Sequence, residues 1–200
     1  NFSAPSVSAA LQQDTGASSS DGRTSNPAIT GSVTDPQGVT TFTAGFGSSP
    51  TYNVLSDRQA NGAFTFTRTR LEQINGGPLA DGPYTLTLRA TNGSGATTQA
   101  TVAFSLDTQV PTLTVALDPS FDTAPVGDEQ TTHATVTLTG QTEALAVVEL
   151  VGLGRTATAD AGGTYSFANV SLVAGANAFT VRATDLAGNQ RTATVTITRL

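Results

Sequence analysis

Residues 84–106 read YTLTLRATNGSGATTQATVAFSL, and this stretch decides the fold class. Apolar residues alternate with threonine or serine in two runs, 84–91 and 101–106, separated by a loop of small residues. Alternation with a period of two is typical of antiparallel strands that bury one face and expose the other to water. The stretch therefore predicts two consecutive antiparallel strands of a β-sandwich.

The same pattern occurs a second time as AFTVRATDLAGNQRTATVTIT at 178–198. Two shorter segments also recur: GAFTF (62–66) returns as GTYSF (163–167), and PSVSAAL (5–11) returns as PTLTVAL (111–117). A repeat of roughly 100 residues indicates tandem domains, each large enough for its own core, and not a solenoid of short units.

Strand-like runs are separated by turn signals such as DPQG (35–38) and AGN (187–189). This spacing predicts an all-β protein made of two tandem Ig-like antiparallel β-sandwich domains, residues 1–107 and 108–200, each with strands A to G. Only RTRLEQI (68–74) has a helical character, of one or two turns. The alternation predicts a core that includes Phe64, Phe66, Leu86, Leu88, Phe104, Tyr165, Phe167, Phe179, Val181 and Ile197.

The composition excludes several kinds of chemistry. The chain has no cysteine, so it can form neither a disulfide nor a thiolate metal site. All nine basic residues are arginine, which removes Schiff-base chemistry and crosslinks between lysine and asparagine. The net charge is -6 without a basic cluster, and this argues against nucleic acid because phosphate binding requires concentrated positive charge.

The sequence also suggests a location. No run approaches the ~18 apolar residues of a membrane span, and Asn1-Phe2 is neither a start site nor a signal peptide. We therefore expect no membrane insertion, and we expect the chain to be a piece of a longer protein. An acidic excess with strands rich in threonine, serine, alanine and glycine is common in secreted bacterial surface proteins, which favours an extracellular location.

The strand count predicts which loops meet at the junction of the domains. If strand A starts at the N-terminal end of a sandwich, its AB, CD and EF loops lie at the C-terminal end, and its BC, DE and FG loops at the other end. The AB loop (13–26) and EF loop (79–83) of the first domain would then face the FG loop (185–189) of the second, together with Asp160.

These loops are acidic. Carboxylates ~5 Å apart repel one another by roughly 1 kcal/mol in water and more near a low-dielectric surface. Several oxygen ligands without histidine or cysteine suit Ca²⁺, which accepts six to eight oxygens in a flexible geometry. We therefore expect a structural Ca²⁺ that fixes the angle between the domains, with the ligands Asp14, Asp21, Asp81, Asp107, Asp185 and Asn189.

The second domain repeats the acidic AB loop with Asp122 and Asp128, which predicts a further calcium site at its C-terminal end. By contrast, the FG loop of the first domain, NGSGA (92–96), lacks the aspartate and final asparagine of DLAGN, so a site towards a preceding domain should be weaker or absent. An alternative stays open: Asp-Thr-Gly and Asp-Gly are turn formers, and DLAGN can be a simple hairpin connection.

Four segments carry a family resemblance: DTGASSSDGRTSNPAITGSV (14–33), ADGPYTLTLRAT (80–91), SLDTQVPT (105–112) and VRATDLAGNQ (181–190). They resemble the tandem bacterial Ig-like repeats of very large secreted and cell-surface proteins, including repetitive adhesins. The resemblance covers essentially the whole chain. It implies that interdomain calcium is held at the positions of Asp14, Asp21, Asp107 and Asp185, and that this calcium extends a long stalk.

Other residues have structural interpretations. His133 is the only histidine and no Gly-x-Ser-x-Gly motif accompanies it, so we do not expect an enzyme. The chain has no tryptophan and three tyrosines, a poor basis for a glycan platform. Tyr84 is placed to bond back across the EF corner. Arg89 and Arg182 occupy the same position in the two repeats, and we expect each to pair with a carboxylate on a neighbouring strand.

The sequence thus predicts a non-enzymatic extracellular spacer or stalk module of a large bacterial surface or secreted protein. Its partners would be adjacent Ig-like domains of the same parent chain, with Ca²⁺ stiffening each junction. Two alternatives remain: an adhesin module that binds a glycan or a protein, and an accessory module of a secreted hydrolase.

Overall fold

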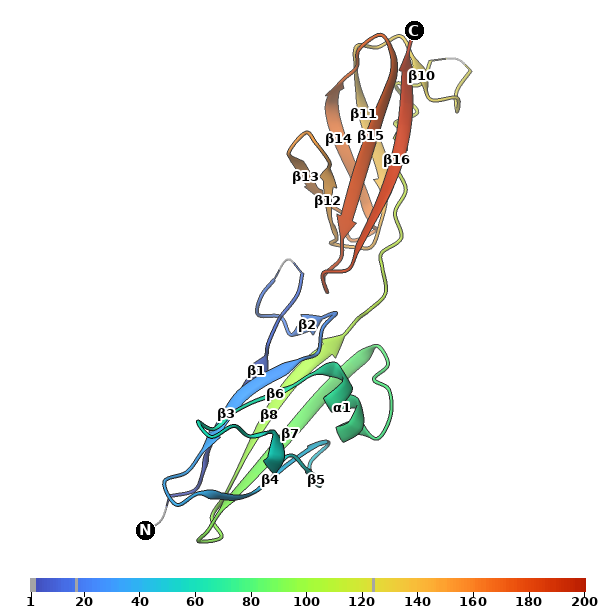
Figure 1. Ribbon diagram of the computed structural model, residues 1–200. Coiled ribbons are helices and arrows are strands. Elements are labelled where there is room, and N and C mark those ends of the chain that lie inside the picture. Colours follow the sequence, from blue (N-terminus) through green and yellow to red (C-terminus); the bar gives the residue numbers. More distant parts are fainter. Residues whose placement is uncertain (1–2, 17, 124) are drawn as a thin grey trace. The chain divides into compact units, whose positions relative to one another are not determined.

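The computed structural model describes residues 3–16, 18–123 and 125–200, and its chain divides into two compact units, Asn1–Thr108 and Gln109–Leu200 (Figure 1). Asn1-Phe2, Ala17 and Ala124 lie outside the described residues, the last two within the predicted AB loops. Each unit consists of a three-stranded sheet and a five-stranded sheet. The prediction of an all-β fold with Ig-like sandwiches is confirmed.

The first unit has the sheets β1-β3-β6 and β2-β8-β7-β4-β5. Neighbouring strands are antiparallel except for β2, which runs parallel to β8. Strand A is therefore divided: β1 belongs to one sheet, and β2, which the sequence analysis placed inside the AB loop, joins the other. The elements are β1 (Ser6–Leu11), β2 (Arg23–Thr24), β3 (Ile29–Thr34), β4 (Val39–Phe46), β5 (Tyr52–Asn53), η1 (Leu55–Asp57), β6 (Ala63–Phe66), α1 (Arg68–Asn75), β7 (Gly82–Asn92) and β8 (Thr97–Leu106).

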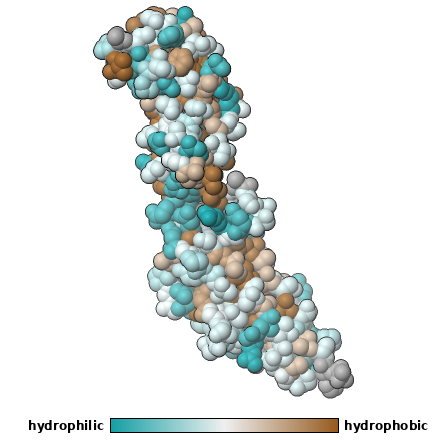
Figure 2. Space-filling view, turned by 180° about the vertical axis from the view of Figure 1, so that it is seen from behind, coloured by the Kyte–Doolittle hydropathy of each residue, from teal (hydrophilic) through white to brown (hydrophobic). Residues whose placement is uncertain are grey.

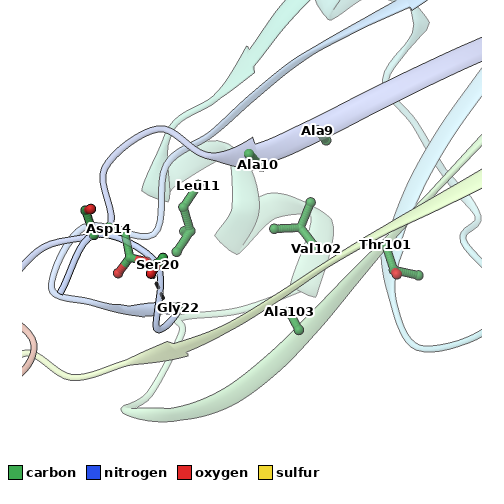
Figure 3. A pocket seen from close by; sticks show the side chains of 10 residues that line it. Ala9, Ala10, Leu11, Asp14, Ser20, Gly22, Thr101, Val102 and Ala103 are labelled. Carbon is green, nitrogen blue, oxygen red and sulfur yellow. Dashed lines mark hydrogen bonds between the residues drawn. The ribbon is translucent and has the colours of Figure 1, made fainter.

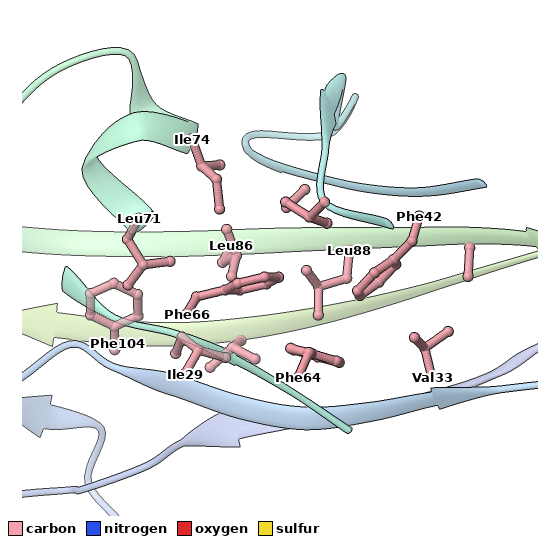
Figure 4. Close-up of a cluster of buried hydrophobic side chains, with 14 of the residues drawn as sticks. Ile29, Val33, Phe42, Phe64, Phe66, Leu71, Ile74, Leu86, Leu88 and Phe104 are labelled. Atoms are coloured by element: carbon pink, nitrogen blue, oxygen red, sulfur yellow. The ribbon is translucent and has the colours of Figure 1, made fainter. Parts of the chain in front are cut away.

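The core of the first unit lies between its two sheets (Figure 4). Phe42 is fully buried, with its ring centroid 5.1 Å from that of Phe64 and 6.4 Å from that of Phe66. The alternation in the sequence places these rings on the inner face because successive side chains of a strand point to opposite sides.

The predicted helix is present as α1, and its ends follow the local sequence. Thr67 caps the start, since its hydroxyl accepts a hydrogen bond from Arg70 N, and Gly76 ends the helix with a φ of 79°. Leu71 and Ile74 are buried under it. Arg70 is bonded to Asp57 at 2.7 Å, and this bond raises the pKa of the arginine.

The second unit repeats the arrangement with the sheets β14-β11-β9 and β10-β16-β15-β12-β13. Again one short strand, β10, runs parallel to the last strand, β16. The predicted core residues are buried, and Phe179 packs against them while partly exposed. The strands are β9 (Ala116–Leu117), β10 (Gln130–Thr131), β11 (Thr135–Gln141), β12 (Val147–Leu150), β13 (Arg155–Thr158), β14 (Thr164–Ser171), β15 (Gly175–Thr184) and β16 (Gln190–Arg199).

A glycine on β3 and another on β11 each allow a close approach. A Cβ on Gly31 would lie 2.1 Å from Ser8 O and 2.6 Å from the Phe64 ring. A Cβ on Gly140 would lie 2.1 Å from Thr114 O and 2.5 Å from the Tyr165 hydroxyl. Only glycine leaves room for the first strand and an aromatic ring at these points.

The EF corner differs between the units. In the first, the Tyr84 hydroxyl donates to Ala80 O at 2.8 Å, as predicted. In the second, Asn177 takes this role, because its side-chain amide donates to Val173 O at 2.9 Å. The corner is therefore closed by a side chain to the carbonyl four residues earlier in both units.

The prediction for the two arginines is half correct. Arg182 forms an ion pair with Glu149 on the neighbouring strand β12. Arg89 lies opposite Thr43 and Gln99, and among the described residues no carboxylate is within ion-pairing distance of it. The expected pair at Arg89 is wrong because the neighbouring strands offer only neutral side chains there.

Tyr165 makes the second unit sensitive to high pH. Its hydroxyl donates to Thr114 O at 2.5 Å, and burial raises its pKa from 10.0 to about 12. A group with a raised folded pKa contributes stability that is present below its unfolded pKa and is lost as pH rises through the folded value. We expect the melting temperature of the second unit to fall between pH 10 and pH 12, and the Tyr165→Phe variant to lose less over this interval. Thermal unfolding across this range checks the prediction, and parallel curves for the two proteins contradict it.

One face of the surface can be described by its hydropathy. The face in Figure 2 is mostly pale or hydrophilic, and hydrophobic colour is confined to separate patches. No helix within the described segments is long and apolar enough to cross a membrane.

Candidate functional site

Four of the predicted ligand residues lie at the C-terminal end of the first unit. β2 pairs with the end of β8, and Asp107 N donates to Thr24 O at 3.0 Å, which brings the loop with Asp14 and Asp21 to the end of strand G. Asp81 reaches the same end, since its Oδ1 accepts bonds from the Thr108 amide at 3.0 Å and hydroxyl at 2.9 Å. The direction predicted for the strands is the one observed within this unit.

Asp14 and Asp21 differ in how their carboxylates are satisfied. Asp14 Oδ2 accepts a hydrogen bond from Gly22 N at 2.9 Å, whereas its Oδ1 is buried and has no hydrogen-bond partner in the part of the chain that the structure describes. Asp21 is exposed, and its Oδ1 accepts a bond from Arg23 N at 3.0 Å. Asp21 therefore acts as a turn former, while Asp14 presents an oxygen that no group among the described residues satisfies.

Thr24 holds this loop in place, a role that sequence reasoning missed. Its side chain is fully buried, and its hydroxyl donates to Gln13 O at 2.9 Å or Asn26 O at 2.8 Å. The only sequence signal was the recurrence of a threonine at Thr131 in the second repeat. Thr131 is equally buried, and its hydroxyl donates to Phe121 O at 2.6 Å.

The AB loop of the second unit repeats the arrangement of the first. Asp122 Oδ2 accepts a bond from Gly127 N at 2.7 Å, and Asp122 Oδ1 is buried without a hydrogen-bond partner within residues 3–16, 18–123 and 125–200. Asp128 is exposed, and its Oδ1 accepts from Gln130 N at 3.0 Å. The two aspartates of each loop thus have the same division of roles in both units.

Asp185 and Asn189 lie at the opposite end of the second unit from Asp122. Asp185 is 3% exposed, and its Oδ1 accepts bonds from Ala187 N and Asn189 N, both at 2.9 Å. Its Oδ2 accepts from the Asn189 side-chain amide at 2.9 Å. Asp160 lies at this end too, where its Oδ1 accepts from Gly162 N and Thr164 N. These bonds are the turn chemistry that the sequence left open as an alternative.

The first unit has an asparagine where the second has Asp185. Asn92 is 2% exposed, and its Oδ1 accepts a bond from Ala96 N at 3.0 Å. Its amide donates to Asp35 Oδ2 at 3.0 Å and to Ser3 O at 2.9 Å. The side-chain amide of Asn92 therefore satisfies one carboxylate oxygen of Asp35 at this end.

The donor sets fit a metal ion only in part. A buried carboxylate oxygen without a donor is costly, so Asp14 Oδ1 and Asp122 Oδ1 each suit an oxygen-preferring cation. However, no three histidine or acidic side chains within residues 3–16, 18–123 and 125–200 come close enough to hold an ion together. Any coordination sphere would need backbone carbonyls, hydroxyls or water in addition to these carboxylates.

His133 has a structural environment. Its backbone N donates to Thr131 Oγ1 at 3.1 Å, and its ring packs edge-on against Phe121 with centroids 5.6 Å apart. His133 thus packs in the short connection between β10 and β11.

The first unit has two open grooves beside the AB loop. One, of about 340 Å³, lies between β1 and β8 and includes Asp14 and Gly22 in its lining (Figure 3). The other, of about 310 Å³, lies on the outer side of β7 and β8 beside Asp21.

These features define a tandem Ig-like β-sandwich protein. The chain belongs to the bacterial Ig-like domain family, whose model matches residues 1–108. A second model, described as domain B of glucodextranase, matches residues 111–199. No curated protein matches the chain.

Several solved structures are similar to the chain to different degrees. The fibronectin(III)-like modules of CbhA from Clostridium thermocellum are 16% identical, with 97% of this chain and 94% of theirs covered and a TM-score of 0.52. A Ca²⁺-stabilised adhesin of an Antarctic bacterium is 22% identical, with 100% and 49% covered and a TM-score of 0.42. A tetra-tandem repeat from the extending region of a large adhesion protein is 23% identical, with 97% and 49% covered and a TM-score of 0.35.

Proposed function

We propose that the chain is a non-enzymatic spacer of an extracellular bacterial protein, in which Ca²⁺ stiffens the junction between consecutive Ig-like domains. The observation that carries this proposal is the pair of orphaned oxygens, Asp14 Oδ1 and Asp122 Oδ1. Each lies in the AB loop, which bonds to the last strand of its unit near that strand's C-terminal end.

Recurrence supports the interpretation. A single buried oxygen without a partner can be an accident of one loop, but the two AB loops differ in length and in most of their residues. Both nevertheless satisfy one oxygen of the aspartate with a glycine amide and leave the other without a donor. Because a buried carboxylate oxygen without a donor occurs in both AB loops, a ligand that supplies positive charge is favoured.

In this proposal Asp14 is the central ligand at the junction, and Asp21, Asp81 and Asp107 are its neighbours on the first unit. The second unit would contribute Asp185 and Asn189. Ca²⁺ would neutralise the carboxylates and accept carbonyl or water oxygens in its remaining positions. Asp122 and Asp128 would serve the next junction.

The mechanism is mechanical. An ion that binds only when neighbouring domains adopt one orientation stabilises that orientation by mass action. Extension of the array then depends on free Ca²⁺, and chelation converts a stiff spacer into a flexible one.

Calcium titration calorimetry on chelator-treated protein tests the proposal. We expect binding to the wild type and a loss of at least about tenfold in affinity for Asp14→Asn. The matched control is Asp118→Asn, which removes a partly exposed carboxylate outside the set and should leave affinity unchanged. Small-angle scattering should show a shorter maximum dimension after chelation, and an unchanged profile with no calcium heat would refute the proposal.

A second function has one supporting observation, the match of residues 111–199 to domain B of glucodextranase. It favours an accessory module of a secreted polysaccharide-degrading enzyme. Sedimentation of the protein with insoluble glucan separates this function from the spacer, which should remain in the supernatant.

A further inference from the structure

The groove between β1 and β8 of the first unit lies where the second unit holds one of its own carboxylates. Its lining combines the apolar side chains of Leu11 and Val102 with the polar groups of Ser20 and Thr101, and Gly22 lies at its edge (Figure 3). The groove is therefore suited to a ligand with a short apolar stem and a polar end.

Leu11 provides a backbone donor at this groove. Gln12 N donates to Ala28 O at 2.7 Å, so the hydrogen-bonded positions of β1 towards β3 are the even residues. In an antiparallel pair the alternate residues direct their N–H groups away from the partner. Leu11 N–H therefore points to the free edge of β1, and within the described residues no protein acceptor bonds to it.

The second unit has the same backbone geometry, but its donor is satisfied. Asp118 N donates to Thr137 O at 2.9 Å, which places Leu117 in the same outward phase as Leu11. Leu117 N donates to Glu129 Oε2 at 2.9 Å. Leu117 is 3% exposed, whereas Leu11 is partly exposed.

Gly22 and Glu129 are equivalent residues. Each precedes the short parallel strand, and each carbonyl accepts a bond from the last strand: Gly22 O from Ser105 N at 2.8 Å and Glu129 O from Thr198 N at 2.9 Å. Both have positive φ, 72° and 59°. A positive φ is uncommon for a residue with a side chain, so the second unit keeps Glu129 in an unfavourable backbone conformation in which its carboxylate reaches Leu117.

We propose that the groove of the first unit binds an aliphatic carboxylate, whose oxygen accepts the Leu11 N–H and whose stem lies against Val102. The ligand takes the place that the Glu129 side chain occupies in the second unit. Asp14 does not preclude this, because Asp122 holds the same position in the loop that carries Glu129. The carboxylate belongs either to a free short-chain acid or to a glutamate of another protein segment. The Leu11 N–H, and not Ca²⁺, supplies the donor here, although Asp14 lines this groove as well.

Amide NMR on the whole chain tests the proposal with butyrate and its neutral analogue butyramide. Butyrate should move the Leu11 amide proton downfield in a saturable manner, and butyramide should move it much less. The peptide acetyl-Ala-Glu-Ala-amide gives the second source, and the tighter of the two ligands identifies it.

Two variants at Gly22 test whether a carboxylate from the chain itself can replace the ligand: Gly22→Glu adds one, and Gly22→Ala does not. Gly22→Glu should shift the Leu11 amide downfield without ligand and abolish its response to butyrate, because a Cβ at Gly22 makes only an ordinary contact, 3.5 Å from Ala103 O. Gly22→Ala has the same backbone cost without the charge and should still respond. Conversely, Glu129→Gly should make the Leu117 amide responsive to butyrate.

Equal shifts with butyrate and butyramide would overturn the proposal. So would a Leu11 amide in Gly22→Glu that matches the one in Gly22→Ala. Both results are readable in folded protein, which the dispersion of the remaining amide signals verifies in the same spectra.

Discussion

Replacing Gly140 by alanine is expected to destabilise the second unit strongly while the first keeps its stability. The new Cβ would lie 2.1 Å from Thr114 O, a backbone atom of the segment that leads into β9, and 2.5 Å from the Tyr165 hydroxyl. Overpacking of this kind costs about 3 kcal/mol or more, a large part of the stability of a domain of this size. We expect a fall in melting temperature on the order of 15 °C for this unit.

The readout separates the two units. Limited proteolysis with mass spectrometry should show new cleavage within 109–200 and none within 1–108. The matched control is Gly152→Ala, where no atom lies within 4 Å of the new Cβ and only a φ of 83° opposes the change. This control should lose about 1 kcal/mol. Equal losses in the two variants, or cleavage spread over both units, would contradict the expected independence.

Replacing Phe42 by alanine is expected to have the reciprocal effect on the first unit. Phe42 is fully buried and its ring contacts those of Phe64 and Phe66, so the change removes an aromatic side chain from the centre of the core. Loss of a buried phenylalanine costs about 3–5 kcal/mol, from lost burial and from the cavity that remains.

Thr41→Ala on the same strand is the control, since Thr41 is exposed and surface changes usually stay within about 0.5 kcal/mol. Chemical denaturation followed by amide NMR should show early loss of the signals of 3–108 in Phe42→Ala. Signals of the second unit should keep their wild-type midpoint. A single shared transition in both proteins would mean that the units stabilise each other.

The sequence was sufficient for the sandwiches because the alternating runs are long. The strands around Arg89 and Arg182 each extend over ten residues or more, and the helix at 68–75 has a capping threonine and a terminal glycine. The two-residue strands β2 and β10 were missed because a period of two cannot be recognised in two residues. They form because the buried hydroxyls of Thr24 and Thr131 fix the loops that lead to them.

The candidate site was less accessible to sequence reasoning. Asp14 and Asp21 are both followed by residues that favour turns, so the sequence treats them alike. The structure distinguishes them through one atom, because Asp14 Oδ1 is buried without a donor while Asp21 is exposed in a turn. Burial of a single oxygen depends on how the loop folds against β8, and no local pattern encodes it.

The parallel pairing of β2 with β8, and of β10 with β16, also bears on how each unit responds to a pulling force. The bonds from Ser105 N to Gly22 O and from Asp107 N to Thr24 O join the start of the unit to its last strand, as those from Thr198 N and Leu200 N do in the second unit. When opposite ends of such a pair are pulled apart, the strands slide along each other and both bonds are strained together. Rupture then requires their simultaneous loss, whereas a hairpin pulled from one end opens one bond at a time.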